Sequence, residues 1–131
     1  MGTLIDTSIL IEAERGRLDL AEHLNESDEY FVSVITASEL LHGLHRSAGS
    51  AASARRRIFI DEALNRFAIL DIDLEVARRH SRIWADLATA GKMIGMNDLW
   101  IAATCLSHDL RLATHNAREF ERVGDLVVEV W

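Results

Sequence analysis

The sequence predicts an α/β protein, a three-layer α/β/α sandwich in which helices cover both faces of a central, mostly parallel sheet. Three observations lead to this prediction. Short segments rich in β-branched residues alternate along the chain with longer segments of helical spacing. Of the 131 residues, 49% are hydrophobic, which is enough for a sizeable core. The chain has no proline and no low-complexity tract, so we expect a single domain over residues 1–131.

The first half of the chain alternates between strands and helices. Its elements are expected in this order: a strand at 3–6, helices at 7–15 and 17–25, a strand at 30–35, and helices at 37–47 and 53–67. The strand YFVSVI is rich in aromatic and β-branched residues. The stretch SAGSAAS reads as the turn between the last two helices.

The second half continues the alternation. It predicts a strand at 68–72, helices at 74–91 and 97–108, a strand at 111–114, a turn at 115–120 and a strand at 126–130. Gly91 suits the left-handed position at which helices often end. From Leu99 to Leu106 the only polar side chain is Thr104, which is typical of a buried helix.

The charge of the chain limits the class of function. The formal net charge is −7, which argues against a strongly basic nucleic-acid binder. It does not exclude a nuclease, because some acids can bind a metal ion while the arginines cluster, as they do at 55–57 and 78–82. A solvated helix face is the simpler interpretation of either run alone.

Cysteine content and the N-terminal sequence favour the cytoplasm. The single cysteine, Cys105, cannot form an internal disulfide, and the sequence lacks a CxxC pair for zinc. The first residues lack a basic stretch, and Asp6 falls where a signal peptide would be apolar. No apolar run approaches the ~18 residues that cross a membrane, so we expect no membrane association.

Acidic and amide side chains recur where strands end. Asp6 closes the first strand, Glu39 lies about one helical turn beyond the second, and Asp98 opens the buried helix. Asn116 and Glu119 follow the strand at 111–114. Because ligands gather at the carboxyl ends of parallel strands, we expect these side chains to converge at one edge of the sheet.

Helix capping is a competing explanation for several of them. Asn97 or Asp98 would be an ordinary N-cap residue for the buried helix. Thr36 and Glu39 have the spacing of a capping box, so for Glu39 the cap and the site are equally good interpretations. Asn116 is also a common turn residue. Glu119 would then be a surface charge.

Asp6 is the hardest to explain structurally, because the end of a buried strand offers no cheap solvation. Clustered carboxylates also repel one another, by ~3 kcal/mol for a pair about 5 Å apart at an effective dielectric constant near 20. Protonation or a bound cation would relieve that repulsion. With oxygen ligands alone, the cation is expected to be hard, either Mg²⁺ or Mn²⁺. Such an ion suits hydrolysis of a phosphodiester bond.

The motifs that carry these residues resemble a known family. The segments LIDTSILIE, TASELLHG, IGMNDLWIAAT, LATHNAREFERV and VEVW occur in the order found in PIN-domain ribonucleases. More closely, they resemble the VapC toxins of bacterial toxin–antitoxin pairs, over nearly the whole chain. The resemblance implies an α/β/α sandwich and an Mg²⁺- or Mn²⁺-dependent endoribonuclease. It also implies a VapB antitoxin as partner and, usually, a homodimer.

The resemblance also implies roles for individual residues. Asp6, Glu39 and Asp98 match the three core acids, which are catalytic and hold the metal. Ser8 matches a hydroxyl two residues after the first aspartate, and Thr114 matches the threonine that ends the fourth strand.

The fourth acid and the RNA contacts are less directly matched. Many relatives place an aspartate where this chain has Asn116, and others keep an acid at the position of Glu119. Because Asn116 carries no charge, we assign the acidic, catalytic role to Glu119 and a neutral supporting role to Asn116. Lys92 and Arg118 are nearest in sequence to the site and are candidate substrate-binding residues.

One alternative function stays open at this point, a PIN-like module that binds RNA or protein without cutting. That interpretation predicts erosion of the acids, whereas Asp6, Glu39 and Asp98 are all present. A haloacid-dehalogenase-type phosphatase would need Asp-x-Asp at the first strand, and the sequence there is Asp6-Thr7-Ser8. The sequence does not indicate which RNA is cut.

Overall fold

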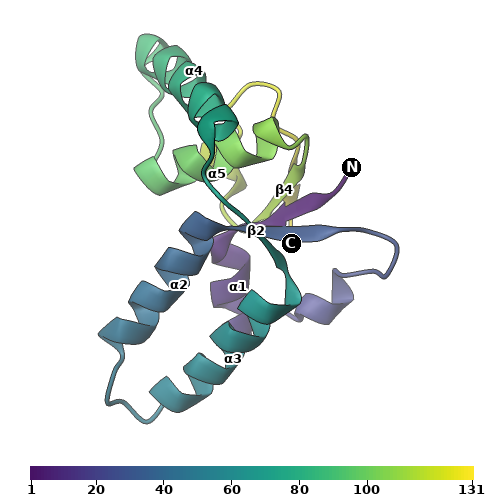
Figure 1. Cartoon of the computed structure of the whole chain (residues 1–131), viewed down its shortest axis with the longest axis vertical. Helices are drawn as coiled ribbons and strands as arrows, with labels where there is room; N and C mark the ends of the chain where they lie inside the picture. Colours follow the sequence, from purple (N-terminus) through teal and green to yellow (C-terminus); the bar gives the residue numbers. More distant parts are fainter.

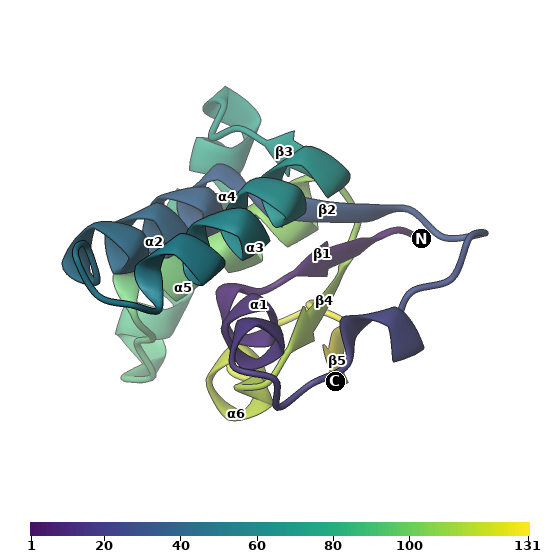
Figure 2. The same cartoon turned by 90° about the horizontal axis from the view of Figure 1, so that it is seen from below.

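A five-stranded sheet forms the centre of the computed structural model, which describes residues 1–131. The strand order is β3-β2-β1-β4-β5, and every neighbouring pair is parallel. The strands are β1 (Thr3–Ile5), β2 (Tyr30–Ser33), β3 (Ala68–Leu70), β4 (Arg111–Thr114) and β5 (Val128–Val130). Figure 2 shows them side by side, with β1 in the middle.

Helices cover both faces of this sheet, as the sequence predicts. They are α1 (Thr7–Glu14), α2 (Val34–Arg46), α3 (Ser53–Arg66), α4 (Leu74–Ala90), α5 (Met96–Ser107) and α6 (Ala117–Phe120), with a short 3₁₀ helix η1 (Leu20–Glu22). In Figure 1, α1, α2 and α3 lie below the sheet and α4 and α5 above it. The predicted three-layer sandwich is therefore confirmed. None of the helices is long and apolar enough to cross a membrane.

Two apolar clusters hold the layers together. Successive side chains of a strand point to opposite faces, so Leu4 and Ile5 of β1 enter different clusters. Leu4 packs with residues of α4 and α5, and Ile5 packs with residues of α1, α2 and α3. Both side chains are fully buried. β1 is thus fixed from both sides, and the residue that follows it is positioned with it.

The structure corrects three local predictions. The helix predicted at 17–25 is only the three-residue η1, because Asp19 and Asn25 accept hydrogen bonds from nearby backbone N–H groups and favour turns. The strand predicted at 30–35 stops at Ser33, whose side chain accepts from the backbone N–H of Ile35 and caps α2. The turn predicted at 115–120 contains the short helix α6, which buries Phe120.

The chain positions the candidate site through the ends of β1, β2 and β4. α1 begins directly after β1, α2 directly after β2, and α6 shortly after β4. α4 ends at Gly91, as predicted, where φ is +66° and a residue with a side chain would be strained. The loop after Gly91 then brings α5 to the same edge of the sheet.

Candidate active site

Asp6 lies at the end of the central strand and is only 3% exposed. Its Oδ2 accepts hydrogen bonds from Ser8 Oγ at 2.7 Å and from Thr114 Oγ1 at 2.8 Å. These donors come from α1 and β4, so one carboxylate oxygen links three elements. The arrangement satisfies a buried charge and fixes its direction.

The same two hydroxyls also hold the loop after β4. Ser8 Oγ accepts from the backbone N–H of His115 at 3.0 Å, and Thr114 Oγ1 accepts from that of Asn116 at 2.9 Å. The Asn116 side chain itself is exposed and makes no hydrogen bond as the N-cap of α6. Its backbone, rather than its amide group, is therefore what the structure fixes at the site.

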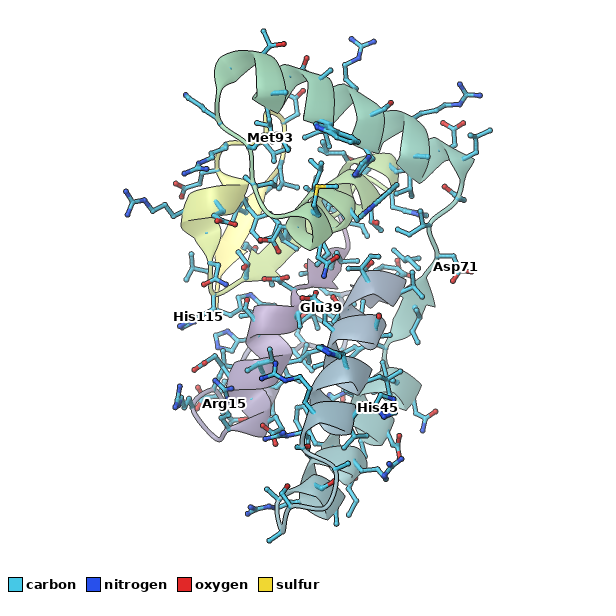
Figure 3. All side chains as sticks on the ribbon, turned by 90° about the vertical axis from the view of Figure 1, so that its left-hand side faces the viewer. Arg15, Glu39, His45, Asp71, Met93 and His115 are labelled. Carbon is cyan, nitrogen blue, oxygen red and sulfur yellow. The ribbon has the colours of Figure 1, made fainter.

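Glu39 projects from the second turn of α2 toward α1. Thr7 Oγ1 donates to Glu39 Oε1 at 2.8 Å and also lies 2.9 Å from Thr36 Oγ1. Figure 3 shows Glu39 where α1 and α2 meet the part of the molecule formed by α4, α5 and α6. The capping-box interpretation is wrong, because Ser33 is the N-cap and Thr36 lies inside the helix.

Asp98 lies in the first turn of α5, and Gly95 occupies the N-cap position. The capping interpretation of Asp98 is therefore also wrong. The pKa of Asp98 is raised to about 7, first by burial, then by a hydrogen bond with Glu119 and by the charges of Asp6, Glu119 and Glu39. Asp6 before α1, Glu39 of α2 and Glu119 of α6 therefore all lie near enough to Asp98 of α5 to act on its charge.

The donor set fits a hard divalent cation in charge and chemistry. The site contains four carboxyl groups, and no Lys or Arg forms an ion pair with any of them. No three Asp, Glu, His or Cys side chains are arranged to coordinate one ion. Each acid is held by a neighbour instead: Ser8 donates to Asp6, Thr7 donates to Glu39, and Asp98 is hydrogen-bonded to Glu119.

The structure does not bring every predicted residue into contact with the acids. Lys92 and Arg118 are exposed, and neither side chain makes a hydrogen bond or an ion pair. Thr7 is a site residue to which the sequence analysis assigned no role. Its position beside Asp6, at the start of a helix, was the available signal. Arg122 donates to the carbonyl of Met93 at 2.9 Å and so ties the segment after α6 to the loop before α5.

Comparison with known proteins identifies the family. The PIN domain model matches residues 3–126. The chain is 34% identical over 128 residues to ribonuclease VapC1 of Rickettsia felis, covering 98% of this chain and 95% of that protein. It is 37% identical over 130 residues to ribonuclease VapC2 of Haemophilus influenzae, covering 98% and 96%. The chain belongs to the VapC family of PIN-domain ribonucleases.

Another VapC relative has a more specific name. The tRNA(fMet)-specific endonuclease VapC of Shigella flexneri is 32% identical over 130 residues, covering 98% of this chain and 96% of that protein. Solved VapC-containing structures share the fold. One is the crystal structure of VapBC2 from Rickettsia felis bound to a DNA fragment from the VapBC2 promoter. It superposes with a TM-score of 0.90 at 27% identity, over 100% of this chain and 99% of that one. VapBC-1 from nontypeable Haemophilus influenzae gives 0.85 at 30% identity, over 100% and 98%.

Proposed function

We propose that this VapC-family protein is a metal-dependent endoribonuclease that hydrolyses RNA phosphodiester bonds as the toxin of a type II toxin–antitoxin pair. The observation that carries the proposal is the convergence of Asp6, Glu39, Asp98 and Glu119 on one another. The curated relatives support it, since they are named as ribonucleases and one as a tRNA-specific endonuclease. The proposed catalytic unit is a single PIN domain over residues 1–131.

We assign the metal to Asp6, Glu39 and Asp98, with Mg²⁺ as the ion and Mn²⁺ as its substitute. When bound, the ion supplies positive charge that favours ionised water and offsets charge on the scissile phosphate. The hydroxyls of Ser8 and Thr114 hold Asp6 in place, and Thr7 does the same for Glu39. These contacts fix the positions of the Asp6 and Glu39 carboxylates before substrate binds, so the two side chains need little rearrangement during the reaction.

Glu119 is proposed to accept the proton of the attacking water, because Asp98 is assigned to the metal. The attacking water forms a bond to phosphorus while the bond from phosphorus to the leaving ribose oxygen breaks. The water must lose a proton in that step, and a carboxylate that does not hold the metal can accept it as a general base. Glu119, hydrogen-bonded to Asp98, can take the proton on to solvent because it is exposed.

A VapB-type antitoxin is the proposed partner, because the similar solved structures are VapBC complexes. We also propose a homodimer in the cytoplasm, where RNA and an antitoxin would both be found. Lys92 and Arg118 are proposed to contact RNA, and replacing both with alanine should reduce the salt dependence of RNA binding. A salt dependence equal to that of the parent would remove them from the RNA path.

The test of the function is cleavage of total RNA by purified protein with Mg²⁺, with Mn²⁺ and with chelator, followed by sequencing of the new RNA ends. We expect cleavage at defined sites only when a divalent ion is present, and none with Asp98→Asn. Binding of RNA without any new ends under all three conditions would favour the non-cleaving PIN-like module instead.

A further inference from the structure

A groove runs between α1, α2 and α3 and begins at the acidic site. It encloses about 480 Å³, and Thr7, Glu39 and Asn97 line the end that it shares with the carboxylates. Away from that end its lining becomes basic, with Arg15, His42, Arg46 and Arg56. In Figure 3, Arg15 lies toward the end of α1 that is remote from Glu39.

The positive charge in this groove is only partly neutralised. Arg56 is 3.2 Å from Glu14 and is paired with it. Arg15 and Arg46 are exposed and form no ion pair within the protein. In a chain of net charge −7, two unpaired guanidinium groups therefore share one groove with the carboxylate site. Such a groove attracts an anion, and guanidinium groups suit phosphate in particular.

The spacing along α2 connects the two ends of the groove. Glu39, Gly43 and Arg46 are separated by four and then three residues, so they lie on one face of the helix. At 1.5 Å per residue, Arg46 is about 10 Å along the axis from Glu39. This separation brings Arg46 within reach of a neighbouring phosphate on the strand whose scissile phosphate lies at the acids.

Gly43 provides a second observation. It lies inside α2, where glycine destabilises a helix relative to alanine, yet a Cβ placed on it would meet no atom within 4 Å. Packing within the protein therefore does not require glycine there. Gly43 does line the groove, so its missing side chain leaves the floor open between Glu39 and Arg46.

We propose that this groove binds the single-stranded RNA segment next to the scissile phosphate, with Arg15 and Arg46 on backbone phosphates and the floor at Gly43 beneath the strand. Phe59 lines the groove on α3 and supplies an apolar face to a base. The inference rests on the proposed function, because it takes the carboxylate end as the place of the scissile phosphate. It adds Arg15, Arg46 and Gly43 to the residues that position substrate.

The test measures binding of a short fluorescein-labelled single-stranded RNA by the full chain in chelator, where no cleavage occurs. The double substitution Arg15→Ala with Arg46→Ala should weaken binding about tenfold and lower the slope of log Kd against log salt concentration by about 1.4, or 0.7 per phosphate contact. The matched control is Arg55→Ala with Arg57→Ala, which removes the same charge from exposed positions outside the groove. Equal losses in both double variants would overturn the proposal.

Gly43→Gln separates a groove contact from a structural effect. Glutamine favours the helix more than glycine does, so the melting temperature should stay level or rise. RNA binding should nevertheless weaken severalfold, because the side chain enters the groove. A higher melting temperature with parental RNA affinity would show that the strand does not cross this floor.

Two further outcomes distinguish this inference from the proposed function. Groove-dependent RNA binding without cleavage under any metal condition would support the groove while the proposed function fails. Parental RNA binding by the arginine variant, with loss of antitoxin binding, would show that a protein chain occupies the groove and would overturn the proposal.

Discussion

Asp98 and Glu119 form a hydrogen bond that two ionised carboxylates cannot make, so the pair shares a proton in the metal-free protein. The proton is retained near neutral pH because burial and three neighbouring acids raise the pKa of Asp98 from 3.8 to about 7. On the proposed function, a metal ion held by Asp98 would displace this proton. Replacing Asp98 should affect both.

Stability should depend on pH through Asp98. Since its pKa is higher in the folded than in the unfolded chain, the folded chain binds more protons between about pH 4 and about pH 7. Without metal, the melting temperature should therefore rise as the pH falls through that window. Thermal melts in chelator check this, and Asp98→Asn should reduce the dependence while raising the melting temperature at pH 8.

The same substitution should reduce the stabilisation by Mg²⁺, because a ligand that binds only the folded state raises the melting temperature more when it binds more tightly. It should also abolish RNA cleavage. Normal cleavage by Asp98→Asn would remove this residue from the site.

Glu39→Gln should keep the fold and lose most of the cleavage. The amide oxygen of glutamine can still accept from Thr7, but it carries no charge for a hard cation. Thr7→Val is the control, since it removes the hydroxyl and leaves the carboxylate. The measurement is the cleavage rate and the melting temperature of both variants. A greater loss of cleavage in Thr7→Val than in Glu39→Gln would show that the orientation of Glu39 is more important than its charge.

Glu119→Gln should weaken the metal dependence of cleavage more than Asn116→Ala does. Glu119 is bonded to Asp98 and acts on its charge, whereas the side chain of Asn116 makes no hydrogen bond. A metal titration of the cleavage rate compares the two variants. The reverse order would return the fourth position of the site to Asn116.

At the scale of elements, the hydroxyls around Asp6 join the central strand to its neighbours. Thr114→Val keeps the shape of a buried β4 residue and removes one of two donors to a buried carboxylate. Hydrogen bonds to charged groups contribute roughly 2 kcal/mol, so the free energy of unfolding should fall by about that amount. Thr104→Val is the matched control, because Thr104 is buried but donates only to the backbone carbonyl of Trp100. Urea unfolding that gives equal losses would show no special role for the contact with Asp6.

The alternation of strands and helices was sufficient to predict the layers and the sheet edge, because periodicity and strand-end position are local properties. Gly91 and the buried helix containing Leu99 were predicted for the same reason. Hydrogen bonds between residues far apart in the sequence could not be predicted in this way. An example is the bond from Thr7 to Glu39, which lies 32 residues further along the chain. The short η1 and α6 depend on side-chain contacts with the backbone and on burial of Phe120.

The basic residues of the groove, like the distant hydrogen bonds, could not be predicted from the sequence. Sequence proximity pointed to Lys92 and Arg118, since Arg118 adjoins Glu119 and Lys92 lies six residues before Asp98. Arg15 and Arg46 lie seven or more residues from any of those acids, and only helix packing brings them to one groove. The carboxylates followed a topological rule that the sequence reveals, whereas the cations depend on how α1, α2 and α3 pack.

For the whole molecule, expression of the chain alone should arrest growth, and co-expression with its genomic neighbour should restore it. The acidic site attracts a cationic side chain, and an arginine of an antitoxin could bind a carboxylate at two points. Growth curves with parent and Asp98→Asn check this, the variant being the harmless control. Harmless expression of a parent that still cleaves RNA in vitro would indicate a nuclease outside a toxin–antitoxin pair.

The contact between Asp6 and Thr114 spans 108 residues and has a consequence for synthesis. Asp6 and Glu39 are translated well before Asp98, Thr114 and Glu119. Because a domain generally folds as a unit, a nascent chain that ends before β4 holds Asp6 and Glu39 without their later partners. The carboxylate cluster therefore forms only once β4 and α6 have been made and β4 has joined the sheet.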